Sequence, residues 1–163
     1  MTLAIDRLLE TTPDDAAIDA FVEEHTFPIV DGTRVTFVYR GPAEAVNLRH
    51  WISGLESSQP LLRVPGTELW HLTVDLPENS RVEYKIEHIG DEGRRWLMDP
   101  LNPRIARDPY GANSVCYGDG YETPEWTLPD EEAREGSIDD LTVQSRALGE
   151  DVPIKIYVPA RFR

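Results

Sequence analysis

Four arginines lie close together in the second half of the chain, and their chemistry suits the binding of anions. Arg94 and Arg95 precede a segment rich in proline and glycine, and Arg104 and Arg107 lie within it. A guanidinium group is planar and charged, and it can donate two parallel hydrogen bonds to a carboxylate or phosphate. Two interpretations stay open, contact with an anionic ligand and pairing with neighbouring acids. The acids available for pairing are Asp91, Glu92, Asp99 and Asp108.

The residue types that perform hydrolysis or bind metals are present, but they do not form the patterns that such sites need. None of the seven serines lies in a G-x-S-x-G sequence. No two of the four histidines are four residues apart, and no cysteine or histidine cluster has metal-ligand spacing. No glycine-rich loop precedes a helix, as a phosphate cradle requires. The sequence therefore predicts no catalytic residue, no metal site and no cofactor in this chain.

Length and composition indicate one folded domain with appendages. The chain has 163 residues, of which 40% are hydrophobic, enough for a real core. Its net charge of −14 argues against binding to nucleic acids or to anionic membranes. No apolar stretch is long enough to span a bilayer, and Asp6 and Arg7 interrupt any signal peptide. The single Cys116 fits a reducing compartment, so we expect a cytoplasmic protein.

The negative charge is concentrated at the two ends of the chain. Residues 1–31 have a net charge of −7, residues 32–118 of −1 and residues 119–163 of −6. The central part is therefore nearly neutral, and the overall acidity does not exclude an anionic ligand near its arginines.

Residues 1–30 are predicted to form a helical arm. Thr12 is expected as the N-cap of a helix that begins at Pro13. Ile18, Phe21 and Val22 recur at helical spacing and would bury one stripe. Two interpretations stay open, packing on the domain's own surface and docking of a partner.

Residues 31–121 are predicted to form an antiparallel β-sandwich. Apolar residues alternate with polar ones around 35–40, 70–76 and 82–88, and turn residues separate these runs. Trp70, His88 and Cys116 continue apolar faces, so we expect all three in the core, whereas His71 should be exposed. Residues 99–124 are rich in proline and glycine and predict an irregular loop with one brief strand near Ser114–Tyr117.

The C-terminal part is predicted to contain a separate β-hairpin. Residues 122–137 form an acidic linker, since 122–140 hold eight acids and one base. Two alternating runs follow, around 141–145 and 152–158, with a turn between them. The apolar edge of this hairpin, within residues 138–163, is expected to pack on the sandwich, on another copy or in a homodimer.

The order of motifs in residues 35–103 resembles an early-set, immunoglobulin-like domain of carbohydrate-binding module family 48. The matching elements are Trp51, Leu62, Gly66 to Trp70, Leu76-Pro77, Tyr84-Lys85 and Trp96 to Pro100. The resemblance implies an all-β, immunoglobulin-like sandwich. In members of that family that bind glycans, two tryptophans and a lysine contact the sugar. By motif position these are Trp51, Lys85 and Trp96, and ordinary surface roles for them stay open.

A later segment is similar to the N-terminal domain of the enterochelin esterase family. The matching residues are Asp99 to Pro103 and Gly111 to Val115, followed by the hairpin. The family joins such a domain to an α/β-hydrolase domain, whose nucleophile elbow and acid and histidine would lie beyond Arg163. The resemblance implies that this chain is a fragment or a relic without catalytic residues. The hairpin is then the start of the hydrolase domain.

These observations lead to one main hypothesis and one alternative. The main hypothesis is a non-catalytic domain of a serine esterase, which shapes access for a small-molecule ester and takes part in dimerisation. Its partner would be the missing α/β-hydrolase domain, and the arginine segment would fold over the active site and hold an anionic or catecholate ester. The alternative is a free-standing glycan-binding module of the family 48 type.

Overall fold

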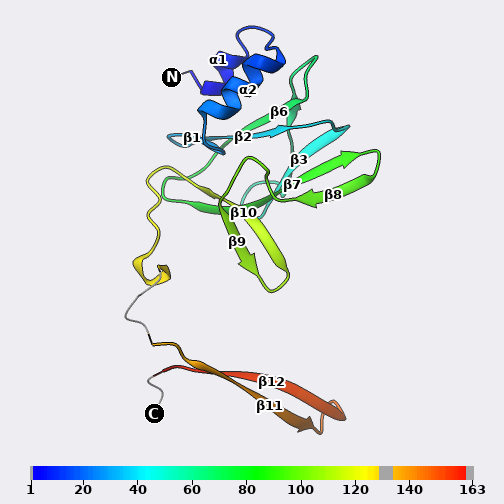
Figure 1. Cartoon of the computed structure of the whole chain (residues 1–163), viewed down its shortest axis with the longest axis vertical. Coiled ribbons are helices and arrows are strands. Elements are labelled where there is room, and N and C mark those ends of the chain that lie inside the picture. The colour runs from blue at the N-terminus through cyan, green and yellow to red at the C-terminus, as the bar shows by residue number, and fades with distance from the viewer. Residues whose placement is uncertain (1, 129–133, 161–163) are drawn as a thin grey trace. The chain divides into compact units, whose positions relative to one another are not determined.

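Residues 2–128 and 134–160 are described by the structure, which is a computed structural model (Figure 1). They divide into two units, Met1–Glu122 and Thr123–Arg163. The first unit consists of the helical arm and the β-sandwich, and the second contains a hairpin. None of the described helices is long and apolar enough to cross a membrane. The mainly β architecture predicted from the alternating runs is confirmed.

Two helices form the arm, α1 (Ala4–Leu8) and α2 (Asp15–Glu24). The predicted N-cap at Thr12 is wrong, because α2 begins two residues later. Asp14 is the N-cap, and its Oδ1 accepts a hydrogen bond of 2.8 Å from the backbone N–H of Ala17. Its carboxylate thus caps the helix and lies at the positive end of the helix dipole.

The first sheet, sheet A, has four antiparallel strands in the order β1-β2-β6-β5. They are β1 (Ile29–Asp31), β2 (Arg34–Arg40), β6 (Leu69–Asp75) and β5 (Leu62–Arg63). Strands β2 and β6 pair along their whole lengths. The sequence indicated these two long strands, whereas β1 and β5 are too short to give an alternating pattern.

The second sheet, sheet B, is built around the ten-residue strand β7 (Arg81–Gly90). One edge of β7 pairs with β3 (Ala45–His50), which pairs in turn with β4 (Ser58–Pro60). Its other edge pairs first with β10 (Gly111–Tyr117) and then with β8 (Gly93–Leu97). Strand β8 and the β9–β10 hairpin therefore lie beside one another along the same edge of β7 (Figure 1).

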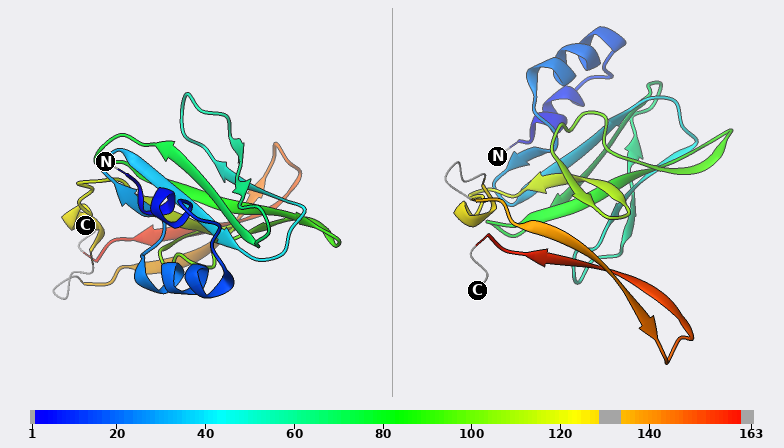
Figure 2. Two further views of the ribbon diagram at one scale, coloured as in Figure 1. Left: turned by 90° about the horizontal axis from the view of Figure 1, so that it is seen from above. Right: turned by 60° about the horizontal axis from the view of Figure 1, so that its bottom comes forward.

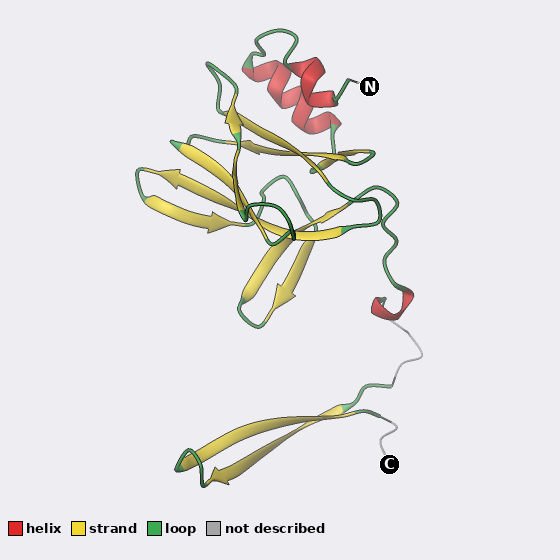
Figure 3. Ribbon diagram, turned by 180° about the vertical axis from the view of Figure 1, so that it is seen from behind, coloured by secondary structure: helices red, strands yellow, loops and turns green. Residues whose placement is uncertain are grey.

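The core has two layers, one on each face of sheet A. Between the sheets lie Phe37, Trp70, Tyr84, Ile86 and their neighbours. Between sheet A and the helices lies a second cluster, which includes Ile18, Phe21, Val38 and Leu69. Figures 1 and 3 show both helices on the side of sheet A. The arm therefore packs on its own domain and covers the outer face of sheet A.

The segment predicted as an irregular loop is more regular than expected. Strand β9 (Ile105–Asp108) pairs with β10, which begins at Gly111 rather than near Ser114. Pro103 and Pro109 bracket β9, and proline next to a four-residue strand conceals the alternating pattern. The expectation for His71 also changes, since it is partly buried beside the arm rather than exposed.

A buried polar network holds the chain before β9. The Tyr84 hydroxyl donates to Asp99 Oδ2 at 2.6 Å, and Asn102 Nδ2 donates to the Tyr84 hydroxyl at 2.9 Å. The backbone N–H of Asp99 donates to Ser114 Oγ at 2.8 Å. Asp99 is 2% exposed and Asn102 5%. The Asp99-Pro100-Leu101-Asn102-Pro103 motif is therefore explained by packing, because its polar side chains satisfy one another inside the protein.

The second unit contains the 3-10 helix η1 (Glu125–Thr127) and a hairpin of two nine-residue strands. These strands, β11 (Ser137–Ser145) and β12 (Glu150–Val158), form one long twisted ribbon (Figure 2). Their pairing sorts the side chains onto two faces. One face, called the aliphatic face below, holds Leu141, Val143, Val152, Ile154, Ile156 and Val158. The other face includes the ion pair between Lys155 and Asp140.

Candidate functional site

The outer face of sheet B is the face that points away from both core layers, and it contains an ordered polar cluster. Its members come from three neighbouring strands. They are Asn47 and Arg49 of β3, Lys85 and Glu87 of β7, and Arg94 and Trp96 of β8. Three of the six side chains are cationic and one is a carboxylate, so this face differs from the acidic ends of the chain.

Glu87 is at the centre of this cluster and is only 2% exposed. Asn47 Nδ2 donates to its Oε2 at 2.8 Å, and Trp96 Nε1 donates to its Oε1 at 3.0 Å. Arg94 Nη1 lies 3.5 Å from the same Oε1. Both carboxylate oxygens are therefore occupied, which makes Glu87 a positioning residue for the indole of Trp96 and the guanidinium of Arg94.

The surroundings keep Glu87 ionised. Burial raises the pKa of its carboxyl, but hydrogen bonds from Asn47 and Trp96 and the charges of Arg94 and Arg49 outweigh burial and lower the pKa overall. A buried carboxylate costs free energy unless donors compensate it, and here they do. The negative charge is thus a fixed part of this face.

Trp96 is half exposed, and its ring is held from two directions. Its N–H is bound to Glu87, and the Arg49 guanidinium lies 4.8 Å from the ring centroid. Trp96 is 45% exposed. Arg49 therefore occupies one face of the aromatic ring, which is the kind of surface on which a sugar would stack.

Trp51 lies at a different place from Trp96. Strand β3 ends at His50, which pairs with Tyr84, whereas Trp96 pairs with Glu87 at the other edge of β7. Trp51 is 63% exposed and lines a cavity of about 530 Å³. The two tryptophans therefore lie near different positions of β7, Trp51 next to the partner of Tyr84 and Trp96 opposite Glu87. Lys85 lies between these two positions, on the outer face.

The four arginines singled out in the sequence do not converge on one site. Arg94 and Arg95 are consecutive in β8 and point to opposite faces, and Arg95 Nη1 pairs with Glu92 at 2.9 Å. Arg104 lies over the ring of Tyr117, 5.3 Å from its centroid. Arg107 is exposed on β9. Within residues 2–128 and 134–160, neither Arg104 nor Arg107 has a carboxylate partner.

Sequence reasoning missed Asn47, Arg49 and Glu87. Glu87 alternates in sequence with the core residues of β7, so the pattern predicts that it is exposed. Its burial becomes apparent only from its cross-strand partner, Trp96. The tight turn between Gly90 and Gly93 contained the missing signal, because it fixes the pairing of Glu87 with Trp96. Among the described residues, no group of histidine, cysteine or acidic side chains is arranged to hold a metal ion.

Comparison with solved structures identifies proteins of the same fold. The ferric enterobactin esterase of Salmonella typhimurium matches with a TM-score of 0.60 and 20% identity, over 84% of this chain and 45% of that one. The enterobactin esterase FES of Shigella flexneri, in the presence of enterobactin, matches with a TM-score of 0.57 and 19% identity, over 83% and 44%. The Shigella flexneri enzyme in the presence of 2,3-di-hydroxy-N-benzoyl-serine gives 0.55 and 19%, over 83% and 43%.

These matches establish a shared fold. The chain spans less than half the length of each esterase it matches. No protein-family model and no curated protein sequence matches it. It resembles the N-terminal part of those esterases, which continue well beyond the matched region.

Proposed function

We propose that this chain is the non-catalytic N-terminal domain of a serine esterase similar to the enterobactin esterases. It would shape the access of a small ester to an α/β-hydrolase domain that follows it. In the intact protein the reaction would be ester hydrolysis through a Ser-His-Asp acyl-enzyme. The main support is the exposed aliphatic face of the hairpin, together with a structural match that spans less than half of each esterase.

The aliphatic face consists of residue types that usually form a hydrophobic core, yet several of its side chains are exposed. Leu141 is 48% exposed, Ile156 42% and Ile154 38%. An isolated two-stranded hairpin is marginally stable in water, so such a face requires a further layer. The first two strands of a hydrolase sheet would receive that layer from the rest of their own domain. A homodimer through the same face is the competing explanation.

Arg104 and Arg107 are the residues of this domain best suited to contact an anionic ester. Neither has a carboxylate partner among the described residues, whereas Arg94 and Arg95 are paired with Glu87 and Glu92. Arg104 also lines a cavity of about 450 Å³ with Tyr117 and Tyr121, whose rings stack at 4.6 Å. A cation beside stacked aromatic rings suits an aromatic, negatively charged acyl group such as a catecholate.

The coding sequence beyond Arg163 tests the main proposal directly. We expect an α/β-hydrolase domain with a G-x-S-x-G nucleophile elbow, followed by its acid and histidine. A reading frame that ends shortly after Arg163 would contradict it. In that case, sedimentation of this chain should instead show a dimer.

The arginine assignment is tested in the full-length enzyme. Arg104→Ala and Arg107→Ala should each lower kcat/KM for an anionic ester by roughly tenfold, because a charge-assisted hydrogen bond to the substrate is lost. Hydrolysis of a neutral ester of the same size should change little. Arg7→Ala, on α1, is the matched control and should leave both substrates unaffected. Equal rates of anionic ester hydrolysis in the wild type and both variants would exclude the assignment.

A further inference from the structure

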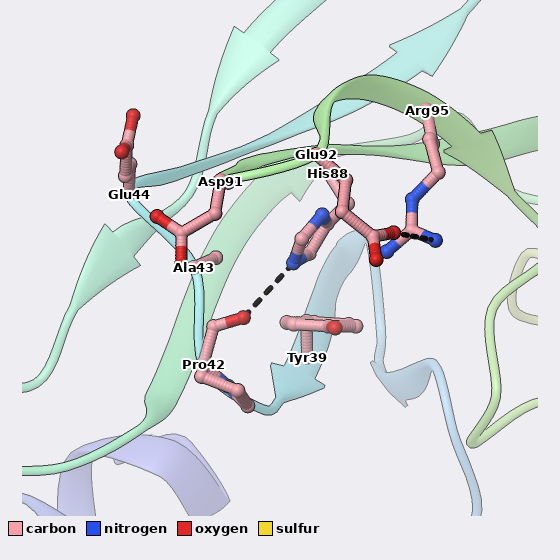
Figure 4. Close-up of a pocket in the computed structure, with 9 residues that line it drawn as sticks. Tyr39, Pro42, Ala43, Glu44, His88, Asp91, Glu92 and Arg95 are labelled. Carbon is pink, nitrogen blue, oxygen red and sulfur yellow. Dashed lines mark hydrogen bonds and ion pairs between the residues drawn. The ribbon is translucent and has the colours of Figure 1, made fainter.

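A separate pocket lies at the edge of the sandwich, beside the turn between β7 and β8 (Figure 4). Its volume is about 590 Å³, within the usual range for small-molecule sites. Tyr39 of β2 and His88 of β7 line it from within, and Figure 4 shows the His88 imidazole standing over the Tyr39 ring. The charged residues around them are Glu44, Asp91, Glu92 and Arg95.

Tyr39 contributes a polar group that lacks a partner. The residue is only 8% exposed, yet its hydroxyl has no hydrogen-bond partner among the described residues. The oxygen itself is not fully buried, since the buried side-chain polar atoms without a partner in the described residues are Ser80 Oγ and His88 Nδ1, so it opens onto the pocket. Burial raises the pKa of this hydroxyl, an effect that Arg95 partly offsets, so it is an uncharged phenol at neutral pH. The oxygen can therefore accept a hydrogen bond from a ligand.

His88 forms a fixed wall of the same pocket. One ring nitrogen, Nε2, lies 2.9 Å from the carbonyl oxygen of Pro42, and since a carbonyl only accepts, Nε2 is the donor. The ring meets that of Tyr39 edge to face, with centroids 6.0 Å apart. Its other nitrogen, Nδ1, is buried without a partner. Two polar side chains, both nine-tenths buried, are thus incompletely satisfied around one cavity.

The charge around the pocket selects the class of ligand. Arg95 is paired with Glu92 at 2.9 Å, so these two charges compensate each other. Glu44 and Asp91 are exposed, and neither forms an ion pair with any residue that the structure describes. The remaining charge is negative, which favours a cation over an anion.

We propose that this pocket binds the primary ammonium group of a small amine or of a lysine side chain. The Tyr39 hydroxyl oxygen accepts a hydrogen bond from the ammonium group, and Asp91 and Glu44 supply the attracting charge. The site belongs to the sandwich alone and does not depend on a hydrolase domain.

Three small ligands of equal chain length distinguish the effect of ligand charge from that of ligand shape. The full chain is titrated with n-butylamine, n-butanol and butyrate at neutral pH, and binding is followed by chemical-shift changes of backbone amides around His88 and Asp91. We expect saturable, millimolar binding of butylamine, much weaker binding of butanol and none of butyrate. Equal binding of butylamine and butanol, or preference for butyrate, would overturn the proposal, as would no binding of butylamine at all.

Two variants locate the site. Tyr39→Phe removes only the hydroxyl and should weaken butylamine binding roughly tenfold, as expected for a hydrogen bond to a charged group. Asp91→Asn, at an exposed position that cannot affect folding strongly, should weaken it about threefold. Tyr110→Phe, at a residue 98% exposed, is the matched control and should bind normally. Unchanged affinity in both test variants would place the amine elsewhere and refute the assignment.

A last arm distinguishes the two sources of ammonium. If free amines are the ligands, butylamine should bind at least as well as N-acetyl-lysine amide. If a lysine of a protein partner is the ligand, the capped lysine should bind more tightly, because Pro42 and the Tyr39 ring offer contacts to its chain. Acetylation of the lysine side chain should abolish binding in either case.

Discussion

Strands β2 and β12 contain similar proportions of hydrophobic residues, aromatic ones included, but they lie in different environments. The five central residues of β2 are all buried, because sheet B covers one of its faces and the helical arm covers the other. In β12, Ile154, Ile156 and Tyr157 remain more than one third exposed. The difference shows that the layers around a strand, and not its own composition, decide how much hydrophobic free energy it contributes.

The largest expected effect compares one core position in each region. Phe37→Ala should lower the free energy of unfolding of the sandwich by about 3–5 kcal/mol, because Phe37 is fully buried and packs on Tyr84. Ile154→Ala in the hairpin should cost less than about 1 kcal/mol, since much of its surface is already in water. Urea unfolding followed by circular dichroism measures both.

A large effect of Ile154→Ala would break the comparison. It would mean that the aliphatic face of the hairpin is covered in solution, and sedimentation would then identify a dimer. If the proposed hydrolase domain follows this chain, Ile154→Ala in the longer protein should cost about as much as a typical core substitution, about 2–5 kcal/mol.

A second prediction concerns carboxylates rather than apolar side chains. Asp99→Ala should destabilise the sandwich by about 2–3 kcal/mol, because it leaves the Tyr84 hydroxyl and the Leu101 N–H without their acceptor. Asp139→Ala is the control in the hairpin, where the residue is exposed among aliphatic neighbours, and it should be neutral. Thermal unfolding of both variants tests the contrast, and equal shifts would contradict it.

The smallest expected effect depends on pH. The pKa of Glu87 is lowered in the folded state, so its contribution to stability is present above the ordinary glutamate pKa of 4.5 and is lost as the pH falls below it. Glu87→Gln should therefore cost roughly 1 kcal/mol at neutral pH and progressively less in acid. The ionisation of Asp99 acts in the opposite sense. Burial raises the pKa of its carboxyl, so its contribution to stability is present at low pH and declines as the pH rises through that raised pKa.

Unfolding curves of the wild type and Glu87→Gln at several pH values test this point. The two should converge as the pH falls. A constant difference across the range would show that the glutamine acts through lost packing with Trp96 rather than through lost charge.

The strands could be predicted from the alternation of apolar and polar residues where only one face of a strand packs against a hydrophobic layer. Alternation around 70–76 and 82–88 located β6 and β7, and it correctly placed Trp70 and Cys116 in the core. Alternation failed to predict burial where both faces of a strand are covered, as at Val38, which is buried by the helical arm. It failed also at β9, whose four residues are too few to show a period.

The candidate site was only partly predictable for a similar reason. Trp96 and Arg94 are conspicuous in the sequence, but Glu87, which holds them, looks like any exposed strand residue. Its role follows from cross-strand pairing, a long-range property that depends on the register of the β7–β8 hairpin. The buried network around Tyr84 likewise joins residues from three separate segments.

The lengths of the outermost strands have a consequence for solubility. The outermost strands of sheets A and B have two to five residues, namely β1, β5, β4, β9 and β8. Short edges offer little template for another chain to pair with. The hairpin instead presents two nine-residue edges beside an aliphatic face, interrupted by Pro153 and by the Lys155–Asp140 pair. Aggregation of this chain should therefore begin at the hairpin, and a version that ends at Glu122 should remain soluble at higher concentration.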